Sequence, residues 1–384
     1  MINDDENIAL CALNRIFGYH PRLALSLMED AGSAAAVFSG EKPCLVEHPE
    51  LADQVNATML EWAAAELKRV REKGFRFLGF SDPEYPDILR EIPDPPMGIY
   101  LNGSSDPAEI FQLHPIVAVV GTRDVSPYGK AWCRKLVQGL ADAPVKPCIV
   151  SGLALGTDGI AHRTALECGL PTIGVMATGI DSVYPWQHEA LAVEMVRTPR
   201  CALVTDYPMG NSPLALNFIR RNRIIAALAR AVIVVESKTK GGSLMTAKYA
   251  CGYDREVYAL PGRADDLCSA GCNSLIRENM ALIITTPEDL AARLGLGAPV
   301  RRAGASWATG PEGFRSALER RYPGDAEAVR VGMAVYGKRG ITPEELARHL
   351  GLAYPRVLEL VGLLEADGFL TTDLLRRCCA LQRR

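Results

Sequence analysis

The sequence predicts an α/β protein whose main domain is a Rossmann-like, doubly wound and mostly parallel sheet. From Pro115 onward, short runs rich in Val and Ile alternate with longer amphipathic stretches, as buried strands alternate with helices. The composition, with 48% hydrophobic and 23% charged residues, excludes a collagen-like, coiled-coil or disordered protein. Because 384 residues exceed the ~100–200 residues of one ordinary domain, we expect further modules on either side of the sheet.

Seven apolar runs are the expected strands of this sheet. They lie at Ile116–Val120, Pro147–Val150, Thr172–Met176, Ala202–Thr205, Ala231–Val235, Glu256–Leu260 and Leu282–Ile284. Helix-like segments fill the intervals, at Pro127–Leu140, Asp158–Cys168, Trp186–Val196, Leu214–Leu228, Ser243–Gly252 and Asn273–Asn279. Ligands bind such sheets where the strands end at their carboxyl side. We therefore expect the functional residues in the loops that follow the strands.

The chain before the sheet is predicted to be an all-helical module over residues 1–75, of the SAM-like or helix-hairpin-helix-like kind. Its expected helices are Glu6–Phe17, Pro21–Asp30, Ala34–Phe38 and Leu51–Lys73. The Pro- and Asp-rich residues 80–103 are expected to be a connector. It belongs to the Rossmann-like domain, which we place at residues 76–296.

The chain after the sheet is predicted to hold a linker and a winged helix. Residues 297–325 are rich in Gly, Ala, Arg and Pro without a period, which is typical of a linker. Residues 326–384 are the expected winged-helix domain. Thr342-Pro343-Glu344-Glu345 begins a helix, Pro355–Asp367 forms the next one, and residues 368–372 form a short strand.

The charge of the chain is unevenly distributed. The formal net charge is −3, but residues 1–100 hold 9 Lys and Arg against 17 Asp and Glu. Between Asn217 and Lys248, by contrast, seven basic residues face a single acid, Glu236. A local basic patch of this kind favours an anionic ligand. It also predicts that residues 1–100 lie away from that ligand.

The cysteines and the N-terminus predict a cytoplasmic protein. The 11 cysteines are odd in number, and the acidic Met1–Glu6 is unlike the start of a secretory signal. No apolar run approaches the ~20 residues that cross a bilayer, so we expect no membrane contact. Cys268 and Cys272 are not followed by a second pair or a His cluster. We therefore expect no metal and no cofactor.

The loop after the first strand has the composition of a phosphate-binding turn. Gly121, Thr122 and Arg123 combine a backbone that a ligand can approach with a guanidinium that fits phosphate. Ser126 is expected to cap the helix that Pro127 begins, and a helix N-terminus is itself an anion site. The spacing matches neither the dinucleotide fingerprint nor a P-loop. The alternative is an ordinary turn with a surface arginine.

The loop after the second strand, Ser151 to Asp158, is also made of small residues. Ser151 and Gly152 are candidate contacts at this strand end. The alternative is that Gly152 and Gly156 only form a turn. His162, one helical turn further on, has no paired Ser or Cys and is interpreted as a packing residue rather than a base.

The third segment carries most of the basic charge. Its candidate ligand contacts are Phe218, Arg220, Arg221, Asn222 and Arg223 on a helix, and Lys240, Gly241, Gly242 and Ser243 in the loop after the next strand. Two glycines before a helix, with Ser243 as the expected cap, would present free N–H groups to a phosphate. The alternative is that the arginines form ion pairs on a solvated face. The local shortage of acids argues against this.

Motifs for catalysis are absent from the sequence. It has no paired-carboxylate motif, nucleophile elbow or Walker lysine, so we predict a binding protein with no catalytic residues rather than an enzyme. Several phosphate contacts without chemistry suit a nucleic-acid backbone. The aromatic residues Phe218, Tyr128, Tyr184 and Trp186 could stack on unpaired bases of a single strand. We expect at least two of these four to lie in the core instead.

These motifs together resemble the DNA-processing protein A (DprA/Smf) family. The resemblance covers about residues 80–295. It is carried by Gly121-Thr122-Arg123, Ser126-x-Tyr128-Gly129, Ser151-Gly152-Leu153-Ala154-x-Gly156-x-Asp158-x-x-Ala161-His162, Gly179-Ile180-Asp181-x-Val183-Tyr184-Pro185, Phe218-x-x-Arg221-Asn222-Arg223-Ile224-Ile225, Gly242-Ser243-Leu244-x-Thr246-Ala247 and Pro261-Gly262. A helical N-terminal module and a C-terminal winged helix also fit the longer members.

The resemblance implies a protein that binds and protects incoming single-stranded DNA. It further implies a homodimer formed through the Rossmann-like domain, and loading of a RecA-type recombinase during natural transformation and DNA recombination. In the family, the residues at the positions of Arg123 and Lys240 contact DNA. Many relatives have a glycine-x-glycine hairpin in the N-terminal module, where this chain has Gly18-Tyr19-His20.

Two other functions stay open. One is a nucleotide-processing Rossmann enzyme of the phosphoribohydrolase type, but its motif carries a catalytic glutamate that the segment Lys240–Ala247 lacks. The other is a transcription regulator built on the winged helix, which would require sequence-specific binding of duplex DNA. The winged helix could equally bind another protein, because the net charge of residues 325–384 is only +1.

Overall fold

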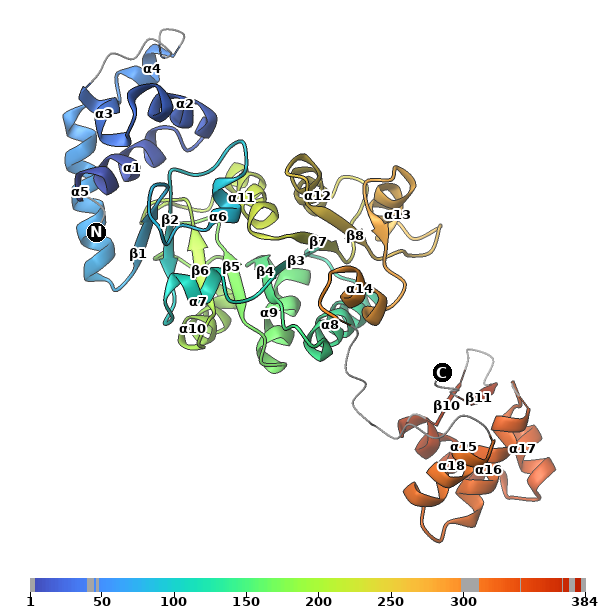
Figure 1. Ribbon diagram of the computed structural model, residues 1–384. Coiled ribbons are helices and arrows are strands. Elements are labelled where there is room, and N and C mark those ends of the chain that lie inside the picture. Colours follow the sequence, from blue (N-terminus) through green and yellow to red (C-terminus); the bar gives the residue numbers. More distant parts are fainter. Residues whose placement is uncertain are drawn as a thin grey trace. The chain divides into compact units, whose positions relative to one another are not determined.

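The computed structural model describes residues 4–39, 45, 48–297, 311–338, 340–367, 369–372 and 377–380. The chain forms two compact units, residues 1–300 and 301–384 (Figure 1). Among the described residues, no helix is both long enough and apolar enough to cross a membrane.

The first unit is built on a nine-stranded sheet with the order β1-β2-β6-β5-β4-β3-β7-β8-β9. All seven predicted strands are confirmed: β3 (Ile116–Val120), β4 (Cys148–Gly152), β5 (Thr172–Val175), β6 (Ala202–Thr205), β7 (Ala231–Val234), β8 (Glu256–Ala259) and β9 (Leu282–Ile283). They are parallel to one another. The predicted α/β fold with a mostly parallel sheet is therefore confirmed.

Two further strands extend the sheet beyond β6 and were not predicted. They are β1 (Arg76–Gly79) and β2 (Gly98–Asn102), and β2 pairs antiparallel with both β1 and β6. The apolar run of β2 directly follows Pro95 and Pro96, so the prolines led to its interpretation as a connector. Tyr100 and Leu101 are buried there, which shows that the run is a true sheet strand.

Helices cover both faces of the sheet (Figure 1). They are α6 (Asp87–Arg90), α7 (Pro107–Phe111), α8 (Pro127–Asp142), α9 (Thr157–Glu167), η2 (Trp186–His188) with α10 (Glu189–Arg197), α11 (Ala215–Leu228), α12 (Gly242–Gly252), α13 (Ala270–Arg277) and α14 (Pro287–Arg293). Side chains alternate along a strand, so Ala118 and Val120 of β3 share a core with α11, α12 and α13, whereas Val117 and Val119 share one with α8, α9 and α14.

The N-terminal helices belong to the same compact unit as the sheet. They are α1 (Asp4–Ile16), α2 (Pro21–Ala31), α3 (Ala34–Ser39), α4 (Pro49–Ala52) and α5 (Ala57–Glu72). Met97, just before β2, packs in one core with Leu10 and Leu13. The helix expected at Leu51–Lys73 is divided, because Asn56 accepts the Met59 N–H at 3.0 Å and caps a new helix. The assignment of residues 1–75 to a SAM-like module stays a prediction.

The second unit has its own core of helices and a two-stranded antiparallel sheet. Its elements are α15 (Pro311–Arg321), α16 (Ala326–Gly337), α17 (Pro343–Leu350), α18 (Tyr354–Ala366), β10 (Leu370–Thr372) and β11 (Cys378–Ala380). The capping box at Thr342 and Glu345 begins α17 where the sequence predicted a helix.

The segment expected as a linker contains a packed helix. Helix α15 buries Phe314 and Leu318 in the core of the second unit, so the described part of that unit begins before residue 326. Residues 298–310 of the same segment lie outside the described residues. The winged-helix assignment stays a prediction.

Candidate functional site

A groove of about 600 Å³ lies at the carboxyl end of β3, between the loop that follows this strand, helix α11 and the start of α12. It brings together nine of the fifteen predicted site residues, from three separate segments: Gly121, Thr122, Arg123, Phe218, Arg221, Asn222, Gly241, Gly242 and Ser243. The parallel topology accounts for this meeting, because β3 and β7 are neighbours and their carboxyl ends share one edge.

The loop after β3 is held by backbone bonds and leaves its arginine free. Thr122 donates its N–H to the carbonyl of Glu236 at 2.8 Å, and Thr157 donates its N–H to the Thr122 carbonyl at 3.2 Å. Arg123 is exposed, and its guanidinium lies 5.1 Å from the centre of the Phe218 ring. Among the described residues, no carboxylate forms an ion pair with Arg123. The guanidinium is therefore available to an anion.

Of the four aromatic residues selected from the sequence, two line the groove and none is fully buried. The rings of Phe218 and Tyr184 lie 5.5 Å apart, edge to face, and both residues line the groove. Tyr128, Tyr184 and Trp186 are exposed by 41%, 47% and 75%, and Phe218 is half-buried. The expectation that at least two of the four lie in the core was wrong.

The floor of the groove holds a buried arginine beside a buried acid. Arg221 donates to the Val175 carbonyl and faces Asp158, and these two residues form no direct ion pair. A Cβ at Gly152 would come within 2.5 Å of both side chains, so only glycine fits there. Burial lowers the pKa of Arg221 and raises the pKa of Asp158, and each partner offsets only part of this effect. Both side chains therefore keep part of their desolvation cost in the folded protein.

The start of α12 presents backbone to the groove. The helix begins at Gly242, with Gly241 as its N-cap and, in this described segment, no side-chain cap. The expected cap, Ser243, instead lies inside the helix and donates its hydroxyl to Ser237 at 2.9 Å. This prediction was wrong because Ser237 offers Ser243 a buried partner. The uncapped first turn favours an anion, and Lys240 is exposed just before it.

Two predicted contacts are supporting residues in this structure. Ser126 caps α8 as expected, accepting the Gly129 N–H at 3.0 Å, and its hydroxyl donates to the buried Glu236 at 2.6 Å. Ser151 is fully buried, with its hydroxyl donated to the Val119 carbonyl at 2.6 Å. Neither lines the groove. Ser151 holds the end of β3, whose Val120 does, and Ser126 joins the start of α8 to Glu236.

His162 is enclosed behind the groove, as its interpretation as a packing residue predicted. Its Nε2 donates to the Gly152 carbonyl at 2.6 Å, and its Nδ1 lies 2.7 Å from the Thr172 hydroxyl. Burial lowers the pKa of His162 to about 4. The imidazole is therefore neutral at pH 7, and both of its nitrogens are engaged.

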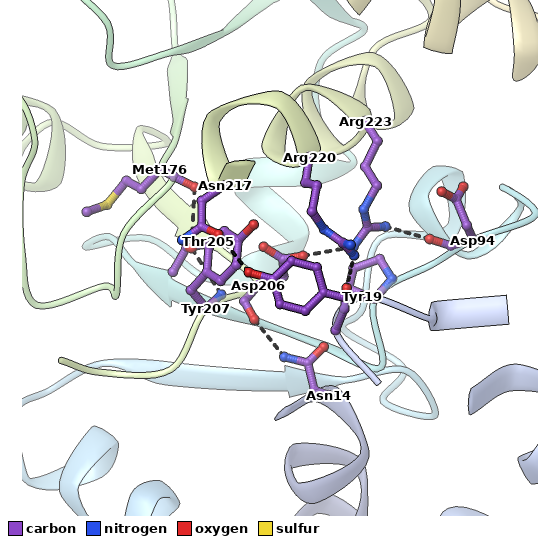
Figure 2. A network of polar contacts seen from close by, with 12 residues as sticks. Asn14, Tyr19, Asp94, Met176, Thr205, Asp206, Tyr207, Asn217, Arg220 and Arg223 are labelled. Atoms are coloured by element: carbon purple, nitrogen blue, oxygen red, sulfur yellow. Dashed lines mark hydrogen bonds and ion pairs between the residues drawn. The ribbon is translucent and has the colours of Figure 1, made fainter. Parts of the chain in front are cut away.

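Arg220 and Arg223 do not line the groove but a second cavity. Figure 2 shows them with Tyr19, Asp94 and Asp206. Arg220 donates to the Gly18 carbonyl, and its guanidinium stacks 4.0 Å from the centre of the Tyr19 ring. Arg223 forms a buried ion pair with Asp206 at 2.8 Å. The basic segment therefore serves two faces, a division that the charge count did not reveal.

The helical phase of α11 could have separated the groove residues from Arg220 and Arg223 in the sequence. Residues 218, 221, 222 and 225 share one face of a 3.6-residue helix, whereas 220 and 223 point away from it. The structure also adds residues to the groove that were not selected from the sequence, including Asp158, Thr246 and Ile219. Asp158 and Thr246 stand in the motifs quoted above, but only the fold shows that they face the groove.

Comparison with known proteins identifies similar sequences and structures. The model of the family described as DNA recombination-mediator protein A matches residues 76–295. Protein Smf of Synechocystis is 41% identical over 229 residues, which are 60% of this chain and 56% of that protein. The putative DNA processing protein DprA of Mycobacterium tuberculosis is 32% identical over 336 residues, or 83% and 81% of the two chains. The chain thus spans little more than half the length of its Synechocystis relative.

Two solved structures share the fold. DNA processing protein A from Streptococcus pneumoniae has a TM-score of 0.60 and 31% identity, with 76% of this chain and 98% of that chain covered. DNA processing protein A from Helicobacter pylori, whose structure concerns a unique mode of binding single-stranded DNA, has a TM-score of 0.51 and 28% identity. The second comparison covers 57% of this chain and 95% of that chain.

Proposed function

Because this chain belongs to the DNA recombination-mediator protein A family, we propose that it binds single-stranded DNA in the groove between the β3 loop, α11 and the start of α12. One observation carries the proposal. An unpaired arginine, Arg123, stacks on Phe218 at a groove that also contains an uncapped helix start. A strand of nucleic acid offers the matching features, a row of phosphates and a row of unpaired bases.

The residues in and beside the groove fall into candidate phosphate contacts and candidate base contacts. Arg123, the exposed Lys240 and the N–H groups of Gly242 and Ser243 would bind phosphate oxygens. Phe218 and Tyr184 offer ring faces and edges for stacking, a contact that every base can make. Binding would therefore depend strongly on salt and weakly on sequence.

The proposed function is binding, without a chemical step. His162 is the titratable group behind the loop after β4, and its neutral ring is enclosed by Gly152 and Thr172. Asp158 sits in the floor, where burial raises the pKa of its carboxyl. These groups stabilise strand ends rather than face a reacting atom.

The more specific part of the proposed function rests on the resemblance to the DprA/Smf family. We propose that the DNA-bound protein protects the strand and transfers it to a RecA-type recombinase during natural transformation, as a homodimer in the cytoplasm. The edge strand β9 supports a self-association surface, since Leu282 and Ile283 are exposed there. Ten free cysteines in the described residues suit a reducing compartment. We also propose a SAM-like module over residues 1–75, a Rossmann-like domain over 76–296 and a winged helix in the second unit, whose described part begins at α15 rather than at residue 326.

Binding of labelled dT oligomers tests the groove. Arg123→Ala and Lys240→Ala should each weaken binding roughly fivefold near 0.1 M salt, because each lost phosphate contact lowers the salt slope by about 0.7 for a single strand. Arg134→Ala, an exposed arginine on α8 that does not line the groove, is the matched control. If both groove variants bind like wild type, the groove is not the DNA site.

Two further measurements test the rest of the proposal. Strand exchange by a purified RecA-type recombinase, on DNA coated with a single-strand-binding protein, should accelerate with the wild-type chain and not with Arg123→Ala. Nucleoside monophosphates incubated with the protein should stay intact. Release of free base would overturn the binding-only function and favour the phosphoribohydrolase alternative.

A further inference from the structure

A second basic cavity lies on the face of α11 that points away from the groove. It has a volume of about 420 Å³, within the range of small-molecule sites. The turn before α2 and the first turn of that helix form one wall, and Arg220, Arg223 and Tyr249 form another. The groove function described above does not use this cavity.

Its charges are only partly balanced. Arg223 is paired with Asp206, and Asp94 is the one acid among the described lining residues. Arg22 and Arg220 also line the cavity, and neither forms an ion pair with a described residue. Even with Asp94 counted against one of them, a full positive charge remains among the described lining residues.

Three further features favour an anion. Helix α2 is eleven residues long, has no acid in its first turn and, in this described segment, has no side-chain cap on its N-terminus at His20. The Nε of Arg223 is buried and has no hydrogen-bond partner among the described residues. The His20 and His48 rings lie 5.8 Å apart at the wall of the cavity and add further N–H donors.

Rings beside these donors suit a nucleotide rather than a bare ion. Tyr19 is partly exposed beside Arg220, and Tyr249 is half-buried on α12. On α11, Ile219 lines the groove, and Leu216 shares the face of Arg220 by helical phase. They are exposed by 45% and 52%. A strand could therefore pass over them from the groove to the cavity.

We propose that this cavity is a second phosphate-binding site, which takes the phosphate of a nucleotide unit against Arg22, Arg220 and the start of α2. If that unit belongs to the bound strand, the inference rests on the proposed function and lengthens the DNA footprint. If it is a free nucleotide, the site is independent of the groove. Either source gives residues 18–23 a role, although the acidic N-terminal charge predicted that they lie away from DNA.

DNA oligomers of increasing length distinguish binding at the cavity from binding at the groove. Arg22→Glu in the full chain should leave the binding of about six nucleotides unchanged and weaken oligomers of about 20 nucleotides by roughly fivefold or more. Arg197→Glu, an exposed arginine on α10 that lines neither site, is the charge-matched control. Thermal unfolding checks that both variants are folded.

Calorimetry with dTMP and with inorganic phosphate distinguishes the two sources. Binding of dTMP that is lost in Arg22→Glu and kept in Arg123→Ala supports a free nucleotide, whereas a length-dependent loss without dTMP binding supports the strand. If Arg22→Glu matches wild type with every ligand while Arg123→Ala weakens DNA binding, the cavity inference fails and the groove stands. If only Arg22→Glu weakens DNA binding, the groove proposal fails and the cavity stands.

Discussion

Helix α11 carries two buried arginines on opposite faces, and their surroundings differ in one respect. Arg223 has a carboxylate in direct contact, Asp206 at 2.8 Å, whereas Arg221 faces Asp158 without an ion pair. Burial alone would lower the pKa of both side chains. The carboxylates of Asp206 and Asp94 reverse that effect and raise the pKa of Arg223, while the pKa of Arg221 stays lowered.

The difference separates a stabilising contact from a ligand site. A protein with a compensated buried pair is strongly destabilised when one partner is lost. Arg221 instead lines the groove without an ion pair to a described carboxylate, so its guanidinium can contact a bound anion there. The same residue type, two positions apart, should therefore affect stability on one face and DNA affinity on the other.

Arg223→Met should cause the largest loss of stability. It leaves Asp206 buried without its partner, so the free energy of unfolding should fall by about 3–5 kcal/mol. The unfolding of the sheet-containing unit in urea measures this loss. The double variant Arg223→Met/Asp206→Leu should recover much of it, because no unpaired charge remains. A single-variant loss below about 1 kcal/mol would contradict the importance of this pair.

Mild acid should destabilise the groove face next. Burial lowers the pKa of His162 from about 6.5 to about 4 in the folded protein, so the unfolded chain takes up the proton first. Its contribution to stability is fully present above pH 6.5 and is lost as the pH falls towards 4, by on the order of 3 kcal/mol at about 1.4 kcal/mol per pKa unit.

The control for this prediction keeps the hydrogen bond and removes the titration. His162→Gln can still donate to the Gly152 carbonyl, and it should flatten the stability profile between pH 6.5 and 4. Urea unfolding of both proteins across this range provides the comparison. An equally steep decline in the variant would assign the acid sensitivity to other groups.

Arg221→Met should lower the affinity for DNA as well as the stability, whereas Arg223→Met should lower the stability alone. Burial already raises the pKa of Asp158, so this carboxyl can take up a proton when its neighbour is lost. The free energy of unfolding should therefore fall by only about 1–3 kcal/mol. The affinity for dT oligomers should fall at least roughly fivefold near 0.1 M salt. Equal losses of affinity in the two variants would remove the distinction between the faces of α11.

The contrast also shows what the sequence could and could not predict. The apolar runs from Ile116 onward predicted the parallel strands, and the loops after them predicted most of the groove, because strand ends of a parallel sheet meet at one edge. The partner of Arg223 could not be predicted, since Asp206 reaches it only through the order of the strands. The prediction of a helix cap failed at Ser243, because its hydroxyl bonds to the buried Ser237 instead.

Ser126→Ala should have the smallest effect, and it tests whether a predicted DNA contact is a support instead. The hydroxyl caps α8 and donates to Glu236, so its loss should cost about 1 kcal/mol of stability. Because no phosphate contact is lost, the salt dependence of dT binding should stay that of wild type. Thr286→Ala, which removes the matching cap of α14 outside the groove, is the control. A flatter salt dependence in Ser126→Ala alone would show that this hydroxyl contacts the strand directly.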